Sequence, residues 1–329
     1  MPPVRILSRT EVERLLSADA CVAAVEDAFR QRGSGAPVPS AVLGLAAEGG
    51  GFHVKAALMA TSREYFAAKV NANYPGNPAA HGLPTIQGVL ALFDASNGVL
   101  LALMDSIAIT IIRTAAASAV AARYLALPGA RTATLVGCGA QAIAQLRAMQ
   151  VVRPLEVVHV LDTDASRRAS FAAQAREVLA LDIVESTDLN RSARASQIVI
   201  TCTTSRRAFL GSGDLSPGAF VAAVGADNEH KQELEPALLA HSVVVADNLE
   251  QCVAIGDLHH AIESGAMTAA QVRAELSEVV VNPARGRRND EEIVVFDSTG
   301  VAFQDVAAAA LVYERADREG VGLSLALGE

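Results

Sequence analysis

Tryptophan is absent from the sequence, and aromatic residues make up only 4% of its 329 residues, whereas hydrophobic residues make up 51%. The core must therefore be built from aliphatic and alanine side chains, as in proteins whose helices pack closely against sheets. A chain of this length is long for a single hydrophobic core, so we expect two domains.

An excess of positive charge and a pattern of paired cysteines are also missing. The formal net charge is −9, which argues against a nucleic acid or an anionic membrane as a partner. Cys21, Cys138, Cys202 and Cys252 are scattered along the chain, so neither a metal site nor a disulfide framework is predicted. The first residues lack a basic segment followed by an apolar run, and we expect a soluble, cytoplasmic protein.

The most apolar long segment runs from Gly98 to Leu127, and it is interrupted by Asp105, Arg113 and Arg123. Charges at such positions are expensive inside a bilayer. The segment therefore predicts a strand followed by a buried helix, and not a membrane span.

The segment 133–142 is an apolar run that breaks into Gly137-Cys-Gly-Ala-Gln-Ala142. Gly137 allows a sharp turn out of a strand, Gly139 allows close approach to a pyrophosphate, and Ala142 allows close packing of the next helix. That helix would present N–H groups and a partial positive charge to phosphates. Taken alone, the pattern also fits an ordinary strand-to-helix turn. A second apolar run ends at Asp162, roughly 20 residues on, where dinucleotide-binding folds place the acid that binds the ribose.

Strands and helices alternate from Thr132 onward, which is typical of a doubly wound parallel sheet. We therefore predict an α/β protein with a Rossmann-type dinucleotide-binding domain at residues 126–300. The loops Thr201–Ser205 and Gly225–Lys231 follow predicted strands and should face the ligand. The strands are expected at 134–136, 157–161, 183–184, 198–201, 220–224, 243–246 and 291–297.

Residues 1–125 follow a different pattern, in which helices come first and short apolar runs follow. Ser8 and Glu11 fit a capping box at the start of the first helix. We expect an α+β domain here, completed by the Ala-rich helix within residues 301–329. Its elements are expected as helices over 8–32, antiparallel strands over 41–70, a polar loop over 71–84, a hairpin over 86–104 and a helix over 109–127.

Three cationic residues outside the nucleotide-binding region lie in or beside apolar runs, where an unpaired charge is expensive. Lys55 and Lys69 also fit solvated charges at strand ends. The helical neighbours of Arg113 are apolar, so we expect a carboxylate partner from the protein or from a substrate. Asp227 and Lys231 follow a predicted strand. Asp227 is a candidate for proton transfer near a nicotinamide; the alternative is that it caps a helix and that Lys231 is a solvated charge.

Motifs spread along the chain combine into one pattern. They are Lys69-Val-Asn-Ala-Asn-Tyr-Pro-Gly-Asn77, Gly82-Leu-Pro-Thr85, the turn from Asp94 to Gly98, Arg113-Thr-Ala-Ala, Gly137-Cys-Gly-Ala-Gln-Ala142, Gly225-Ala-Asp227 and Asp297-Ser-Thr-Gly300. In this order, over about residues 5–318, they resemble the ornithine cyclodeaminase/mu-crystallin family.

The resemblance implies that Lys69 and Arg113 hold the carboxylate of an amino acid beside the nicotinamide, and that Asp227 transfers protons with Lys231 nearby. Asp227 and Lys69 are thus the catalytic candidates, and Thr85 joins the candidates for substrate binding. A dimer is also implied, with residues 1–125 and 301–329 as the substrate and dimerisation domain. The cofactor-binding candidates are Gly137, Gly139, Ala140, Gln141, Asp162, Thr201, Thr203, Gly225, Lys231 and Ser298.

Two positions depart from the family pattern. Ser40 stands where members often carry an arginine after a proline. Lys55 stands where ornithine cyclodeaminases use a glutamate to bind the distal amine. A lysine there repels a second ammonium group and can replace the missing arginine as a carboxylate ligand. The sequence therefore predicts a small or cyclic imino or amino acid without a cationic tail as the substrate, and it disfavours ornithine.

The predicted activity is the NAD(P)H-dependent reduction of a cyclic ketimine carboxylate, pyrroline-2-carboxylate or piperideine-2-carboxylate, to proline or pipecolate. Asp162 favours NADH because its charge repels a 2′-phosphate, while Arg167 and Arg168 leave NADPH open. One alternative within the resemblance is an ornithine cyclodeaminase or alanine dehydrogenase. Another, of a different class, is a mu-crystallin-like protein that binds NAD(P) and a small ligand without turnover. The expected partners are a small substrate and a second copy of the chain.

Overall fold

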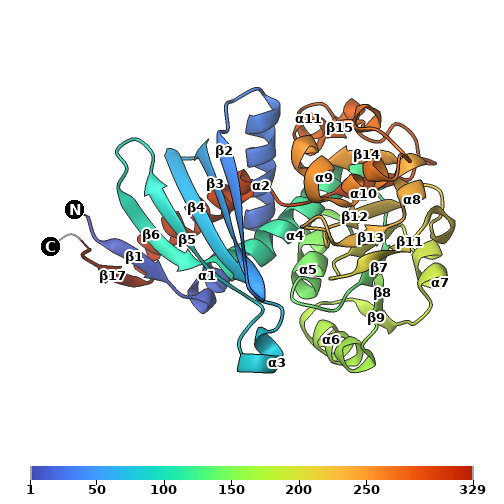
Figure 1. Cartoon of the computed structure of the whole chain (residues 1–329), viewed down its shortest axis with the longest axis horizontal. Coiled ribbons are helices and arrows are strands. Elements are labelled where there is room, and N and C mark those ends of the chain that lie inside the picture. Colours follow the sequence, from blue (N-terminus) through green and yellow to red (C-terminus); the bar gives the residue numbers. More distant parts are fainter. Residues whose placement is uncertain (1, 328–329) are drawn as a thin grey trace. The chain divides into compact units, whose positions relative to one another are not determined.

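The computed structural model describes residues 2–327, which divide into two compact units (Figure 1). The first unit contains the described residues up to Ala28, Gly35–Arg113 and those from Val301 onward; the second contains Phe29–Ser34 and Thr114–Gly300. The sequence pattern placed the first boundary at residues 125 and 126, at the end of a helix. In the structure the boundary lies inside that helix, α4 (Ser106–Leu125).

The first unit is built on one sheet, whose described strands follow the order β17-β1-β6-β5-β4-β3-β2. Neighbouring strands are antiparallel, except that β1 pairs with β6 in parallel. The predicted antiparallel strands and hairpin are confirmed, whereas β1 and β17 were not predicted. The strands are β1 (Val4–Leu7), β2 (Ser40–Ala47), β3 (Gly50–Ala60), β4 (Glu64–Asn73), β5 (Ile86–Asp94), β6 (Leu100–Asp105) and β17 (Leu323–Leu325).

The long C-terminal helix α12 (Ala302–Glu319) packs against β3 and β4 in the first unit. The helix α1 (Arg9–Leu15) follows β1, and at its start the backbone N–H of Ser8 donates to Glu11 Oε2 at 2.8 Å, as the predicted capping box requires. The helix α2 (Ala18–Gly33) follows, and the short helix α3 (Asn77–His81) lies in the predicted polar loop.

The second unit has a parallel sheet with the order β15-β14-β16-β12-β10-β7-β8-β9 among the described strands, which confirms the Rossmann-type prediction. The chain runs from β7 outward to β9 and then returns to β10 on the other side of β7. Such a reversal of strand order is where doubly wound sheets bind their ligands. The strands are β7 (Thr132–Val136), β8 (Val157–Leu161), β9 (Asp182–Glu185), β10 (Ile198–Thr201), β12 (Phe220–Ala223), β14 (Val243–Ala246), β15 (Ala274–Glu275) and β16 (Val294–Asp297).

Four neighbouring strands of this sheet, β10, β12, β14 and β16, are buried at every residue, as expected for a parallel sheet covered on both faces. A small parallel pair, β11 (Arg206–Leu210) and β13 (Gln232–Leu234), was not predicted. The helices are α5 (Ala142–Val152), α6 (Ala165–Val178), α7 (Leu189–Arg194), α8 (Pro236–Ala240), α9 (Leu249–Ile255), α10 (Asp257–Glu263) and α11 (Leu276–Val281), with 3-10 turns η1 (Ser212–Asp214), η2 (Ala269–Gln271) and η3 (Pro283–Arg285).

The apolar segment near residue 100 forms β6 and then α4, as predicted. In the described part of the chain, α4 is the one helix long and apolar enough to cross a membrane, and 67% of its apolar window is buried inside the protein. Burial of this kind is what the core helix of a globular domain requires.

Candidate functional site

The glycine turn of the second unit lies between the end of β7 and the start of α5. Gly137 has φ 101°, and a Cβ added there would lie 2.8 Å from the carbonyl oxygen of Cys202. Both the left-handed backbone and the close neighbour therefore require glycine at this position. A Cβ at Gly139 would meet nothing within 4 Å. The space above Gly139 is open, as binding of a pyrophosphate against the backbone requires.

Asp162 follows β8 and holds the glycine turn in place. Its Oδ2 accepts a hydrogen bond from the backbone N–H of Cys138 at 2.9 Å, and its Oδ1 accepts one from Asp164 N–H at 2.9 Å. Carboxylate oxygens keep further lone pairs after one bond each, so Asp162 can still accept from ribose hydroxyls. Beside the turn lies a cavity of about 370 Å³, within the size range of ligand pockets. It is lined by Cys138, Gly139, Ala140, Ile143, Arg167, Ser170, Phe171 and Gln174.

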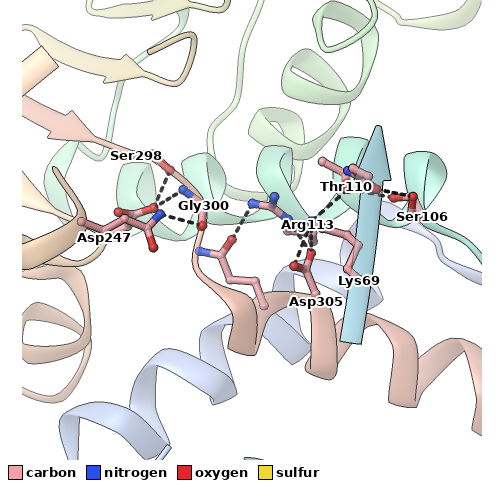
Figure 2. A network of polar contacts seen from close by, with 11 residues as sticks. Lys69, Ser106, Thr110, Arg113, Asp247, Ser298, Gly300 and Asp305 are labelled. Atoms are coloured by element: carbon pink, nitrogen blue, oxygen red, sulfur yellow. Dashed lines mark hydrogen bonds and ion pairs between the residues drawn. The ribbon is translucent and has the colours of Figure 1, made fainter. Parts of the chain in front are cut away.

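Gln141 stands at the N-terminal cap position of α5, and Thr201 is the buried last residue of β10. Ser298, which follows β16, donates its hydroxyl to Asp247 Oδ2 at 3.1 Å, and Gly300 N–H donates to the same oxygen at 2.6 Å (Figure 2). Asp247 therefore fixes the backbone of the segment after β16, and it was not among the predicted residues.

Glu233 connects the two loops that were predicted to face the ligand, and sequence reasoning missed it. Its Oε1 accepts from the backbone N–H of Thr203 at 2.6 Å, and its Oε2 accepts from the backbone N–H of Gly225 at 3.0 Å. The side chain is fully buried. Burial, with the charge of Asp257 nearby, raises the pKa of Glu233 to about 7. No local pattern in the sequence distinguishes this glutamate from the surface acids around it.

Asp227 and Lys231 form an ion pair in the turn after β12, with 2.7 Å between Asp227 Oδ1 and Lys231 Nζ. The Asp227 side chain is 49% exposed, whereas that of Lys231 is 18% exposed. Within the described residues no helix begins at Asp227, so the helix-cap alternative is wrong. Lys231 is not a solvated charge either, because it has an acidic partner.

In the first unit, Lys69 from β4 and Arg113 from α4 converge on one carboxylate, that of Asp305 from α12 (Figure 2). Lys69 Nζ lies 2.9 Å from both Oδ1 and Oδ2, and Arg113 Nε lies 2.9 Å from Oδ1. The three residues are exposed by only 4%, 4% and 2%. The carboxylate partner expected for Arg113 is thus Asp305, and the strand-end alternative for Lys69 is wrong.

Two further contacts complete this cation cluster, by which we mean Lys69, Arg113 and Asp305. Lys69 Nζ donates to Thr110 Oγ1 at 3.1 Å, and Arg113 Nη1 donates to Gln304 Oε1 at 2.9 Å. Gln304 and Asp305 are neighbours on α12, whereas Thr110 and Arg113 lie on successive positions of one face of α4. Each cation is therefore held by two acceptors.

The charges in this cluster shift each other's pKa. The pKa of Lys69 is lowered to about 7: burial is the largest cause, the negative charge of Asp305 opposes it, and the positive charges of Arg113 and Lys55 add to it. Burial alone would raise the pKa of Asp305, but the charges of Lys69 and Arg113 outweigh burial and lower it. Lys69 can therefore exchange its proton near neutral pH, whereas Asp305 stays ionised.

Lys55 lies directly opposite Lys69 in the register of β3 and β4, so the two side chains share one face of the sheet. Ser40 is the exposed first residue of β2. Thr85 precedes β5, and its carbonyl oxygen accepts from Tyr74 N–H at 2.8 Å. Within the described residues, no hydrogen bond joins Thr85 to Lys69 or Arg113.

The four cysteines are free thiols; Cys21, Cys138 and Cys252 are buried, and Cys202 is partly buried. Among the described residues, His259, His260 and Glu263 bring possible metal-ligand atoms within 4.8 Å of one another. A ring nitrogen of His259 lies 3.0 Å from the carbonyl oxygen of Val253, one of His260 lies 2.8 Å from that of Lys231, and Glu263 is exposed. We assign no metal to this group.

Residues 4–320 match the sequence profile of the ornithine cyclodeaminase/mu-crystallin family. The chain belongs to this family. An archaeal alanine dehydrogenase, described as a dimer with bound NAD, superposes with a TM-score of 0.93 at 33% identity over 99% of each chain. The pyrroline-2-carboxylate reductase of Thermococcus litoralis, in complex with NADH and L-proline, superposes with a TM-score of 0.92 at 31% identity over 97% of this chain and 99% of the other.

An iminosuccinate reductase from Paracoccus denitrificans is 32% identical over 324 residues, which cover 96% of this chain and 98% of the relative. The resemblance inferred from the motifs is therefore confirmed over nearly the whole chain. Because these similar proteins are all reductases or dehydrogenases that share its fold, the chain is an oxidoreductase.

Proposed function

We propose that the protein reduces a cyclic ketimine carboxylate, pyrroline-2-carboxylate or piperideine-2-carboxylate, to L-proline or L-pipecolate, with NADH as the favoured cofactor. The cation cluster carries this proposal. Lys69 and Arg113 are buried and oriented, and each keeps N–H donors beyond those bound by Asp305, Thr110 and Gln304. Donors of this kind suit a planar carboxylate. The similarity to a reductase whose structure is in complex with NADH and L-proline supports the proposal.

In this proposal Lys69 and Arg113 hold the substrate carboxylate and so orient the C=N bond. When bound, NADH supplies the hydride that is added to the C=N carbon. A proton must be added to the nitrogen, and Asp227 transfers this proton, directly or through water. Lys69 is the second candidate because its pKa of about 7 allows proton exchange at neutral pH.

The cofactor assignment is tested by Gly139→Ala, with Gly129→Ala as the matched control. A Cβ meets nothing within 4 Å at either glycine, so both variants should fold normally. In our proposal only the Cβ at Gly139 occupies the place of the pyrophosphate, and NADH should bind about tenfold or more weakly there. Equal NADH affinity in both variants, measured by calorimetry, would remove Gly139 from the cofactor site.

Lys55 sets the class of substrate in this proposal. It adds a third positive charge on the face of β3 and β4 that carries Lys69, so a substrate with a cationic tail is repelled. The same charge favours an acyclic imine with two carboxylates as a second candidate, in line with the similarity to an iminosuccinate reductase. Lys55→Glu should lose most activity on carboxylate imines, and Lys55→Gln should lose less. Unchanged activity of Lys55→Glu would refute this role.

The first experiment is to measure NADH and NADPH oxidation with pyrroline-2-carboxylate, piperideine-2-carboxylate, and pyruvate or oxaloacetate with ammonia. Ornithine with NAD⁺ is assayed for proline in parallel. Rapid turnover of a cyclic imine supports the proposal and decides cofactor and ring size together. Turnover of pyruvate alone favours an alanine dehydrogenase, and proline from ornithine favours a cyclodeaminase. Binding of NAD(H) without any turnover would favour a mu-crystallin-like binding protein.

A homodimer is part of the proposal, and the sheet of the first unit supports it. Leu43, Val54, Val70 and Val89 are directly opposite one another across β2, β3, β4 and β5, and they form an apolar row on the face opposite to that of Lys55 and Lys69. Three of them are large exposed side chains, at 53% for Leu43, 38% for Val70 and 43% for Val89. Exposed apolar faces of this kind mark interfaces.

Leu43→Glu should convert the dimer to a monomer in analytical ultracentrifugation. The control is Val178→Glu, at a 44% exposed position at the end of α6 in the second unit. A monomeric wild-type protein, or a dimer that survives Leu43→Glu, would contradict this part of the proposal.

A further inference from the structure

The cation cluster contains an acid, Asp305, whose presence is not explained by substrate binding alone. It is fully buried on α12 and contacts both cations that are proposed to hold the substrate. A carboxylate already in this place competes with a substrate carboxylate for the same donors. Its presence therefore needs a reason, and the hydrogen-bond geometry supplies one.

The donors that Asp305 uses are a subset of those available. An arginine side chain has N–H groups on Nε, Nη1 and Nη2. Asp305 binds Nε, and Gln304 binds one N–H of Nη1. Both N–H groups of Nη2 and one of Nη1 are left, and in the described residues no hydrogen bond uses them. The Lys69 ammonium similarly keeps one proton after its bonds to Asp305 and Thr110.

We propose that Asp305 is a positioning residue for substrate binding: it fixes Lys69 and Arg113 in one orientation, places a negative charge beside both cations, and leaves their remaining N–H donors for the substrate carboxylate. This inference rests on the proposed function. With Asp305 ionised and Lys69 protonated, the cluster has one positive charge in excess, which the substrate carboxylate neutralises. A cluster without Asp305 would place two like charges together in a buried site.

The negative charge of Asp305 changes the pKa of Lys69 in a known direction. The pKa of Lys69 is lowered to about 7: burial lowers it most, Arg113 on α4 and Lys55 on β3 also lower it, and Asp305 on α12 raises it. Cys21 on α2 also interacts with Arg113, and burial raises the pKa of this thiol to about 12, so it stays neutral. Removal of the Asp305 charge must therefore deprotonate Lys69 at a lower pH, and carboxylate binding should fail at a lower pH as well.

The test compares Asp305→Asn with Asp317→Asn, which removes an exposed acid from the same helix. For Asp305→Asn we expect kcat/KM on the imine to fall about 100-fold. The pH at which kcat/KM declines on the alkaline side should shift downward by about one unit or more, because removing one charge partner of a buried group commonly has this effect. Asp317→Asn should change neither. A folded Asp305→Asn variant with an unshifted pH profile would overturn the inference.

Two further variants separate orientation from charge. Gln304→Met releases Nη1 of Arg113 without changing the charge of the cluster, so kcat should fall while the pH profile stays in place. Asp305→Glu keeps the charge but displaces the carboxylate, and the same result is expected. It also serves if Asp305→Asn does not fold. A pH shift in either variant equal to that of Asp305→Asn would contradict the charge argument.

A binding measurement distinguishes failure of this inference from failure of the proposed function. Affinities of L-proline and pyrrole-2-carboxylate are measured by calorimetry against pH, with NADH present. If the wild-type protein binds them but reduces no imine, the proposed function fails, and the pH dependence of binding in Asp305→Asn still decides the inference. If the wild-type protein binds neither carboxylate, the inference fails too, because Asp305 would then have no substrate to position.

Discussion

The two units each bury a cluster of ionisable side chains, and burial has opposite outcomes in them. In the first unit Asp305 lies between Lys69 and Arg113, and their charges lower its pKa although burial opposes this. In the second unit Glu233, Asp257 and Asp297 are buried with one another. Burial raises their pKa values, to about 7 for Glu233, to about 6 for Asp257 and well above the ordinary value for Asp297.

The difference shows that the partners of a buried acid decide its charge. Asp305 has two cations within 2.9 Å. The acids of the second unit are held instead by backbone N–H groups: Asp257 Oδ1 accepts from Glu233 and Leu234, at 2.8 and 2.9 Å. Backbone N–H groups stabilise a carboxylate, but they do not offset both burial and a neighbouring acid. The first cluster is thus suited to binding an anion, and the second to holding loops.

The largest expected effect comes from breaking the first cluster with Arg113→Met. Asp305 would lose a buried partner, which should lower the free energy of unfolding by about 3–5 kcal/mol. The activity should fall at least about 100-fold because the substrate carboxylate loses its donors. The control is Arg131→Met, which breaks an exposed pair with Glu156 and should cost about 0–1 kcal/mol. Chemical denaturation and kcat/KM measure both, and equal losses of stability in the two variants would refute the comparison.

A smaller effect is expected when the second cluster is disturbed by Gly225→Ala. The new Cβ would lie 2.5 Å from the carboxyl group of Glu233, which must then leave the N–H groups of Thr203 and Gly225. We expect the free energy of unfolding to fall by about 1–3 kcal/mol and NADH to bind more weakly, because both loops lose their anchor. Gly213→Ala, where a Cβ meets nothing within 4 Å, is the control. Unchanged NADH affinity in Gly225→Ala would show that Glu233 does not position the cofactor loops.

The smallest effect concerns Asp257→Asn and depends on pH. The raised pKa means that folded Asp257 keeps its proton between about 4 and about 6, whereas the unfolded chain loses it. The contribution of this group to the free energy of unfolding is therefore full below that window and is lost as pH rises through it. Asparagine cannot ionise, so the variant should gain roughly 1–3 kcal/mol relative to wild type between pH 4 and pH 7.

Urea denaturation at several pH values measures this change, and a difference between variant and wild type that stays constant with pH would contradict it. The contribution of Asp305, the acid of the first cluster, to the free energy of unfolding changes with pH in the opposite direction. Because the pKa of Asp305 is lowered, its contribution to the free energy of unfolding is present above the ordinary pKa and is lost as pH falls through the lowered one.

Much of the fold could be predicted because its signals are local. The apolar runs that became β7, β8, β10, β12, β14 and β16 are short, continuous and separated by helical patterns, and the glycines at 137 and 139 mark the turn that such a sheet requires. β1 and β17 were missed for a physical reason. They are short, and they become strands by pairing with a distant part of the chain, so no local pattern specifies them.

By itself, the sequence determined the order of elements, the nucleotide-binding turn, and the two cations, Lys69 and Arg113, whose apolar surroundings made them expensive to leave unpaired. Only the tertiary structure decided which acid forms ion pairs with these two cations and which acids do not. Asp305 reaches Arg113 across 192 positions of the chain, and Glu233 joins two loops from a strand that the pattern did not predict. The partners of an acid depend on which helix packs on which strand. The sequence shows only that a residue is an acid, and it does not show whether its neighbours are cations, backbone N–H groups or water.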